Sequence, residues 1–199
     1  LVITELLQSR EHRLIISVCS ERGAEIMADV PGEPARDGDI AQVKTLLERT
    51  KREAGPHRVD MRGLRELLLN SLESPCWDDT GARCLTCGNC TSVCPTCFCT
   101  SVHDSTNIQG THAERTRVSD SCFTMAYSYA TGGSVRYTPS ARYRQWLMHK
   151  FATWTDQFGS PGCVGCGRCL TWCPVGIDVT EVIGRIRGSS QRRKEVSDG

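Results

Sequence analysis

The apolar positions of the first 30 residues follow a pattern typical of a short α/β segment. Residues 13–19 form an apolar run rich in β-branched side chains, which predicts a strand, and residues 1–7 are placed to pair with it. Ser20 is a favourable N-cap for a short helix that runs through Met27. Residues 31–34, Pro-Gly-Glu-Pro, break the chain, and we expect a domain boundary there.

From residue 39 onward the apolar positions recur with helical spacing. Asp39 is the predicted N-cap of a first helix that ends before Gly55. Leucines at positions 64, 67, 68 and 72 predict a second helix, and Ser74-Pro75 the start of a third. Residues 100–139 are polar and glycine-rich without clear periodicity, which predicts mostly loop.

Two further helices are expected in the last third of the chain. Ser140 is the predicted N-cap of a helix that ends at Gly159 and carries an apolar stripe of Tyr143, Leu147, Phe151, Trp154 and Phe158. Asp178 and Glu181 resemble a capping box for the last helix. The pattern predicts a mainly α protein with a small N-terminal α/β segment, divided into residues 1–34, a helical domain 35–187 and a frayed polar tail 188–199.

Composition excludes several classes of protein. The 24 Lys and Arg residues nearly balance the 23 Asp and Glu residues, so the charge predicts no nucleic-acid partner. No window is apolar enough for a membrane span, and no secretory signal precedes the first strand, so we expect a cytoplasmic protein. The chain lacks an initiator Met, and we interpret it as a piece of a longer protein. Its thirteen cysteines are odd in number and clustered, which favours metal ligands over disulfides.

One internal repeat carries the chemistry. Residues 84–95 and residues 163–174 both follow the pattern Cys-x2-Cys-x2-Cys-x3-Cys-Pro, with a glycine after the second cysteine. This run is typical of bacterial ferredoxins with two [4Fe–4S] clusters, in which the fourth cysteine of each run binds the other cluster. The predicted ligands of the first cluster are Cys84, Cys87, Cys90 and Cys173, and those of the second are Cys163, Cys166, Cys169 and Cys94.

The alternative is structural zinc in an interaction module. Zinc sites usually join two Cys-x2-Cys pairs across a longer gap. Here eight cysteines form two tight groups of four, each followed by proline, so we favour two [4Fe–4S] clusters.

Five cysteines lie outside the repeat. Cys97 and Cys99 follow the first copy directly and are candidates for a third metal centre or a redox-active thiol site. The alternative, which the short spacing favours, is that they are small buried residues beside the first cluster. We expect Cys122, Cys76 and Cys19 to lie in the core.

The segment between residues 115 and 150 interleaves basic and aromatic side chains. Such a pattern can bind nucleic acid, but we prefer a docking face for a protein partner, and a plain solvated helix face is equally plausible for residues 141–150. No nucleotide-binding motif and no catalytic arrangement is visible. We therefore expect no flavin, nicotinamide or catalytic site on this chain.

Several stretches resemble the dicluster iron–sulfur β subunit of cytoplasmic, NADP-linked [NiFe] hydrogenases, the sulfhydrogenases. They are residues 83–101, 120–124, 132–135, 142–147, 156–159 and 162–178. The A subunit of anaerobic sulfite reductase is a near relative. The resemblance is dense from about residue 83 to residue 187 and thin before that.

The resemblance implies an α-helical ferredoxin fold and the eight repeat cysteines as cluster ligands. It also implies a role as an electron-transfer subunit, between a flavin subunit that handles NADP(H) and the small subunit beside the large [NiFe] subunit. The same role in a sulfite-reducing complex is the alternative. Cys97 and Cys99 match the family's Thr-Cys-Phe-Cys element without a fixed role.

Overall fold

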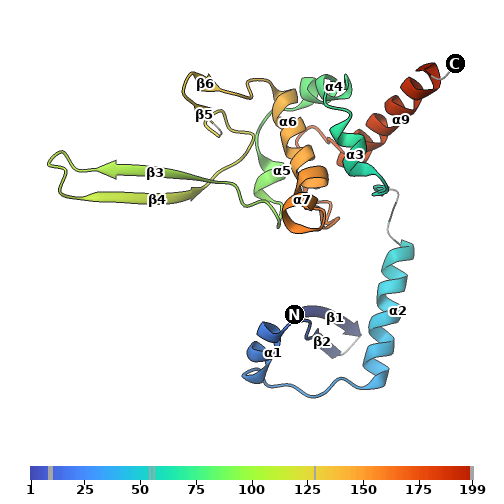
Figure 1. The fold of residues 1–199 in the computed structure, drawn as a ribbon. Helices are drawn as coiled ribbons and strands as arrows, with labels where there is room; N and C mark the ends of the chain where they lie inside the picture. The colour runs from blue at the N-terminus through green and yellow to red at the C-terminus, as the bar shows by residue number, and fades with distance from the viewer. Residues whose placement is uncertain (9–10, 54, 56, 128, 198–199) are drawn as a thin grey trace. The chain divides into compact units, whose positions relative to one another are not determined.

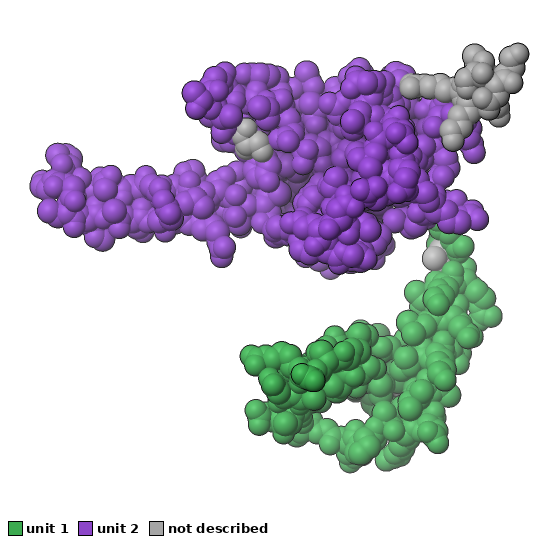
Figure 2. Space-filling model, in the orientation of Figure 1, with its two compact units in different colours: residues 1–58 green, residues 59–199 purple. Residues whose placement is uncertain are grey.

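The computed structural model describes residues 1–8, 11–53, 55, 57–127 and 129–197. The chain divides into two compact units, residues 1–58 and residues 59–199 (Figure 2). It is mainly helical, and the sheets found in the described residues are small and two-stranded. None of the helices in this part of the chain is long and apolar enough to cross a bilayer.

The first unit begins with the antiparallel hairpin that its apolar pattern predicts. Strand β1 (Val2–Gln8) pairs with strand β2 (Glu11–Ser17). Helix α1 (Glu21–Ala28) follows, and Ser20 Oγ accepts the Gly23 N–H at 3.2 Å. Ser20 is therefore the N-cap, as predicted, because its side chain satisfies a donor of the first helical turn.

Helix α2 (Asp37–Glu53) completes the first unit by packing against β1. The chain break expected at residues 31–34 lies within this unit, between α1 and α2. Asp39 is not the N-cap, because the helix begins two residues earlier. Its carboxylate accepts the Arg36 N–H at 3.2 Å and forms an ion pair with Arg13 of β2. This ion pair ties the helix to the hairpin.

The second unit is built around a long helix that contains a π-helical turn. Helix α6 (Pro139–Met148) continues into the π-helical turn η1 (His149–Thr153) and then into α7 (Trp154–Phe158). The predicted apolar stripe is buried in its first part, at Tyr143, Leu147 and Phe151, whereas Phe158 at its end is exposed. A π-helical turn is rare and is often found at functional sites.

The N-terminal end of this helix differs from the prediction, whereas its C-terminal end agrees with it. The N-cap is Thr138 and not Ser140, since Thr138 Oγ1 accepts the Ala141 N–H at 3.1 Å. Proline occupies the first helical position after this cap, where its missing N–H has no cost. At the other end Gly159 ends the helix with a φ of 73°, as predicted.

Helices α3 (Leu64–Leu69) and α4 (Cys76–Arg83) pack against the interrupted helix, and α9 (Val179–Ser197) packs against α3 and α4 (Figure 1). Helix α4 follows Ser74-Pro75 closely, with Pro75 as its N-cap, one residue later than predicted. Helix α9 continues to residue 197 and so includes most of the segment that was expected to be a polar tail. The largest buried apolar residues are Leu64, Leu68, Trp77, Phe123, Tyr143, Trp146, Leu147, Phe151, Ile183 and Ile186.

Helices α4 and α6 approach so closely that no side chain fits between them at Gly81. A Cβ atom at this position would lie 2.6 Å from Ser140 N and 2.8 Å from Ser140 Cα. Both atoms belong to the backbone and cannot move aside cheaply. The close approach therefore requires glycine at this position.

An exposed hairpin replaces much of the loop that was expected at residues 100–139. Strand β3 (Thr100–Thr106) pairs antiparallel with β4 (Ala113–Ser119), and the hairpin extends away from the helices of its unit (Figure 1). Almost all of its strand residues are exposed, so neither face needs alternating apolar positions, and the sequence carries no strand period there. Arg115 pairs with Asp104 across the strands at 2.7 Å. A second, very short pair, β5 (Tyr129–Ala130) and β6 (Gly133–Ser134), follows.

Candidate metal centres

Each copy of the cysteine repeat folds into a loop followed by one turn of helix. Gly88, with a φ of 76°, precedes α5 (Asn89–Ser92), and Gly167, with a φ of 71°, precedes α8 (Arg168–Thr171). Glycine adopts this left-handed conformation without the steric cost that a Cβ brings, which explains the glycine after the second cysteine of each copy. Helices α5 and α8 pack against each other, so the sequence repeat becomes a paired structural repeat.

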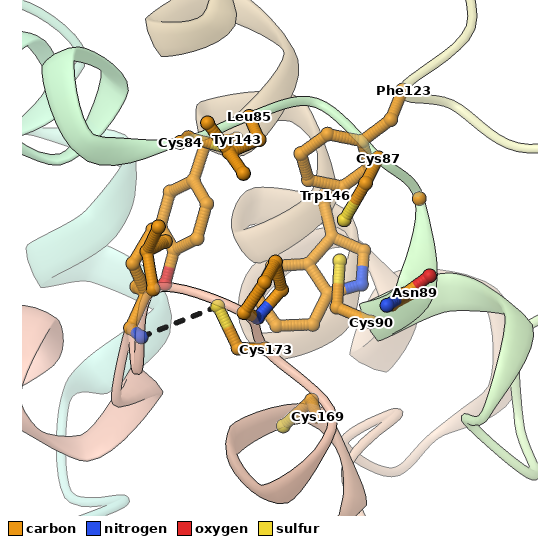
Figure 3. Close-up of a pocket in the computed structure, with 14 residues that line it drawn as sticks. Cys84, Leu85, Cys87, Asn89, Cys90, Phe123, Tyr143, Trp146, Cys169 and Cys173 are labelled. Atoms are coloured by element: carbon orange, nitrogen blue, oxygen red, sulfur yellow. Dashed lines mark hydrogen bonds between the residues drawn. The ribbon is translucent and has the colours of Figure 1, made fainter.

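Three cysteines of the first copy and two of the second line one cavity (Figure 3): Cys84, Cys87, Cys90, Cys169 and Cys173. Its remaining wall is mostly apolar and includes Phe123, Tyr143 and Trp146. The Ile177 N–H donates to Cys173 Sγ at 3.3 Å, the dashed line in Figure 3. The four predicted ligands of the first cluster therefore share one apolar cavity, with Cys169 of the other predicted set beside them, and four thiolates are the usual ligands of an iron–sulfur cluster.

Backbone N–H groups reach the cysteine sulfurs at equivalent positions of the two copies. The Thr86 N–H donates to Cys84 Sγ and the Gly165 N–H donates to Cys163 Sγ, both at 3.4 Å. Residues 86 and 165 both have positive φ values, 51° and 70°. Such a conformation is costly for threonine, so the fold holds strain here to keep this N–H on the sulfur. Hydrogen bonds of this kind favour anionic sulfur and help to set a cluster's potential.

Burial makes these thiols difficult to ionise without a bound cation. Burial, and after it the neighbouring cysteines, raises the pKa of Cys90 to about 12. Burial is also the main reason that the pKa values of Cys84 and Cys169 lie above that of an ordinary thiol. A metal supplies the missing positive charge, and its binding releases the protons. The chemistry of the donor set therefore suits a metal centre better than free thiolates.

The fourth cysteine of the first copy lies with the second copy. After burial, the thiols of Cys163, Cys166 and Cys94 raise the pKa of Cys169. Thr96 ties the two segments together, because its hydroxyl donates to Gly162 O at 2.6 Å and lies 3.2 Å from Cys94 Sγ. Cys94 therefore lies beside the second copy, while Cys169 also lines the cavity of the first group.

Lys150 is a buried cation that faces this second group. Its side chain, in the π-helical turn, is only 4% exposed, and Nζ lies 3.1 Å from Cys94 Sγ and 3.3 Å from Gly162 O. Hydrogen bonds from Cys97, Thr96 and Lys150 lower the pKa of Cys94 to about 4, against the effect of burial. Lys150 follows Trp146 by four residues and so shares the buried side of the helix, which is the sequence signal that could have identified it.

The five remaining cysteines fall into different environments. Cys76 and Cys122 are buried, as predicted, whereas Cys19 is exposed and its expected place in a core is wrong. Cys97 and Cys99 are half-buried and line a second cavity together with Cys122. Cys97 and Cys99 also pack against the hydrophobic core, which agrees with their interpretation as packing residues.

The expected docking face between residues 115 and 150 does not form as one surface. Arg142, Tyr143, Trp146 and Lys150 are all at least 96% buried. The Arg142 guanidinium donates to Arg136 O at 2.9 Å, so it supports the chain inside the unit. Arg142, Tyr143 and Trp146 of α6 therefore build the interior of the unit, whereas Arg144 of the same helix is partly exposed.

Comparison with known proteins agrees with this geometry. Residues 83–177 match the family model of the 4Fe-4S dicluster domain, which spans both copies of the repeat. The chain is also similar to the sulfhydrogenase 2 subunit beta of Pyrococcus furiosus, with 36% identity over 150 residues. The aligned part covers 75% of this chain but 44% of the relative, so the chain spans less than half of that protein's length. No solved structure matches the chain.

Proposed function

We propose that this chain, an iron–sulfur protein of the 4Fe-4S dicluster family over residues 83–177, is an electron-transfer subunit that carries two [4Fe–4S] clusters. The observation that supports the proposal is an exchange of cysteines between the two copies of the repeat. Cys173 and Cys169 of the second copy line the cavity of the first copy's cysteines, and Cys94 of the first copy is linked through Thr96 to Gly162, next to Cys163. When bound, the clusters supply one-electron transfer, which none of the twenty side chains performs readily at low potential.

The ligand sets follow from this exchange. Cys84, Cys87, Cys90 and Cys173 would hold the first cluster, and Cys163, Cys166, Cys169 and Cys94 would hold the second. The apolar wall of Tyr143 and Trp146 would exclude water from the first site. Cys90 and Cys94 are four residues apart in the first copy but belong to different ligand sets, so the two cluster sites lie close together. This short separation suits electron transfer from one cluster to the other. An α-helical ferredoxin fold fits these sites. In chain order, helix α6 lies between the two copies of the repeat and helix α9 follows the second copy.

The partners are proposed from the similarity to a sulfhydrogenase beta subunit. We place the chain in a complex in which it passes electrons between a flavin-containing NADP(H) subunit and the small subunit of a soluble [NiFe] hydrogenase. The chain then needs no catalytic residue of its own.

Anaerobic purification of the native complex from its own host tests this proposal. We expect iron and acid-labile sulfide on this chain, and a flavin subunit together with nickel-containing subunits among the proteins that copurify with it. A sirohaem-containing partner would replace the hydrogenase assignment by a sulfite-reducing complex. Zinc without labile sulfide would overturn the electron-transfer role itself.

The crossed ligand sets predict which variants resemble one another. Replacing Cys94 by serine removes a ligand of the second cluster, although Cys94 follows the first copy in sequence. The electron paramagnetic resonance spectrum of Cys94→Ser should therefore match that of Cys166→Ser, with the signal of the first cluster retained. A spectrum that matches Cys87→Ser instead would show that each copy binds its own cluster without exchange.

A further inference from the structure

A second cavity in the same unit is lined by cysteines that the two-cluster assignment leaves unused. It has a volume of about 220 Å³. Cys97, Cys99 and Cys122 line it, with Tyr127, His149 and Lys150. None of these three cysteines forms a disulfide. A buried cysteine packs well without other cysteines beside it, so packing alone does not explain three thiols on one cavity.

The fold brings these cysteines together across the exposed hairpin. Cys97 and Cys99 precede β3, and Cys122 follows β4, so the whole hairpin lies between them in sequence. The Asp120 N–H donates to Cys99 O at 2.9 Å and closes the base of the hairpin. Cys99 and Cys122 then line the same cavity from the two ends of the hairpin.

A buried cation lies between this cavity and the second group of cysteines. Lys150 Nζ lies 3.7 Å from Cys97 Sγ, and its side chain is almost completely buried. Among the described residues, no carboxylate forms an ion pair with Lys150. A buried ammonium group is costly unless an opposite charge compensates it. Sulfur ligands of a metal centre on the Cys94 and Cys97 side would supply that charge.

The cavity also lies next to both proposed cluster sites. The indole of Trp146 lines this cavity and the one around Cys84 and Cys90, so one side chain separates the two. On the other side, Lys150 Nζ contacts both Cys97 Sγ, at 3.7 Å, and Cys94 Sγ, at 3.1 Å. A redox centre in this cavity would therefore have a neighbour on each side.

We propose that Cys97, Cys99 and Cys122 bind a third iron–sulfur centre. The described residues contain no group of three or more His, Cys, Asp and Glu side chains placed to hold a single metal ion. An iron–sulfur cluster instead distributes its ligands over several iron atoms, and the three cysteines stand around a cavity that is larger than one ion. His149 is the fourth ligand that the chain offers, and its Nε2 lies 3.3 Å from Gln157 Oε1, the support that a metal-bound histidine usually has. The binding site itself does not depend on the identity of the partner complex.

Iron and acid-labile sulfide analysis of the anaerobically purified full-length chain tests this proposal. Two [4Fe–4S] clusters account for about eight iron atoms per chain, and a third centre adds about two to four. We expect the higher value in the native chain, and about eight in Cys99→Ser and Cys122→Ser. The matched control is Cys19→Ser, which alters an exposed cysteine in the other unit and should keep all of the iron.

The outcomes separate the two proposals of this article. About eight iron atoms in the native chain, with free thiols or a disulfide at Cys99 and Cys122 by mass spectrometry, would overturn the third centre and leave the two clusters intact. Absence of iron would overturn both proposals. If Cys122→Ser does not fold, Cys99→Ser still decides the question, because Cys99 is half-buried and tolerates a change better than the buried Cys122.

Discussion

At the scale of single residues, Lys150 has the clearest effect on the proposed chemistry. Its ammonium group lies beside Cys94 Sγ in a buried place, where electrostatic effects are strong. A positive charge stabilises the reduced, more negative state of a neighbouring cluster. We expect Lys150→Met to lower the potential of the cluster that Cys94 binds, by about 60 mV for each 1.4 kcal/mol of lost stabilisation.

A redox titration followed by electron paramagnetic resonance would measure this shift. The matched control is Lys44→Met, which removes an exposed lysine from α2 and should leave both potentials unchanged. Equal potentials in Lys150→Met and the native protein would mean that Lys150 has only a packing role.

Individual residues also mark the limit of what the sequence predicts. The eight repeat cysteines can be identified from spacing alone, because a cluster constrains the positions of its ligands. The burial of Lys150 is harder to predict, because its spacing of four residues from Trp146 indicates the buried side of the helix, whereas a lysine on an amphipathic helix usually keeps its charged end in water. The π-helical turn of residues 149–153, which contains Lys150, has no sequence feature that predicts it.

At the scale of elements, the contact between α4 and α6 can be tested at Gly81. The methyl group of Gly81→Ala would meet Ser140 backbone atoms at less than 3 Å, so the helices must separate. We expect a loss of about 1–3 kcal/mol in the free energy of unfolding, which is usual for overpacking. Thermal unfolding followed by circular dichroism would measure it.

Gly184→Ala provides the matched control for that change. Gly184 lies in α9, and a Cβ there would have no neighbour within 4 Å. Alanine is a better helix former than glycine, so this variant should be neutral or more stable by up to about 1 kcal/mol. Equal melting temperatures for the two variants would show that the close approach at Gly81 is not maintained in solution.

Elements were predictable where one face is buried. The hairpin of β1 and β2 and the helices α1 and α6 all have apolar periodicity, and each was identified to within a few residues. The hairpin of β3 and β4 was not, because its stability comes from the backbone ladder and from pairs such as Asp104 and Arg115. Polar side chains on both faces give no period to detect.

At the scale of the whole molecule, metal centres hold together segments that are far apart in the chain. Each proposed cluster joins residues 84–94 to residues 163–173, and metal binding contributes directly to folding. We expect removal of iron by a chelator under reducing conditions to increase amide hydrogen exchange in both segments. The first unit has its own hairpin and helices, so exchange in residues 2–7 should change little. Unchanged exchange in both cysteine segments would contradict this view.

The β3–β4 hairpin has a mechanical consequence. Its two strands leave the helical body at Cys99 and return at Asp120, and the hydrogen bond between these residues closes its base. The strands are joined by a ladder of seven residue pairs, which transmits force along the hairpin. A molecule that binds the far end of the hairpin can therefore apply a torque at its base, beside Cys99 and Cys122. Such a torque would change the distance between these two sulfur atoms.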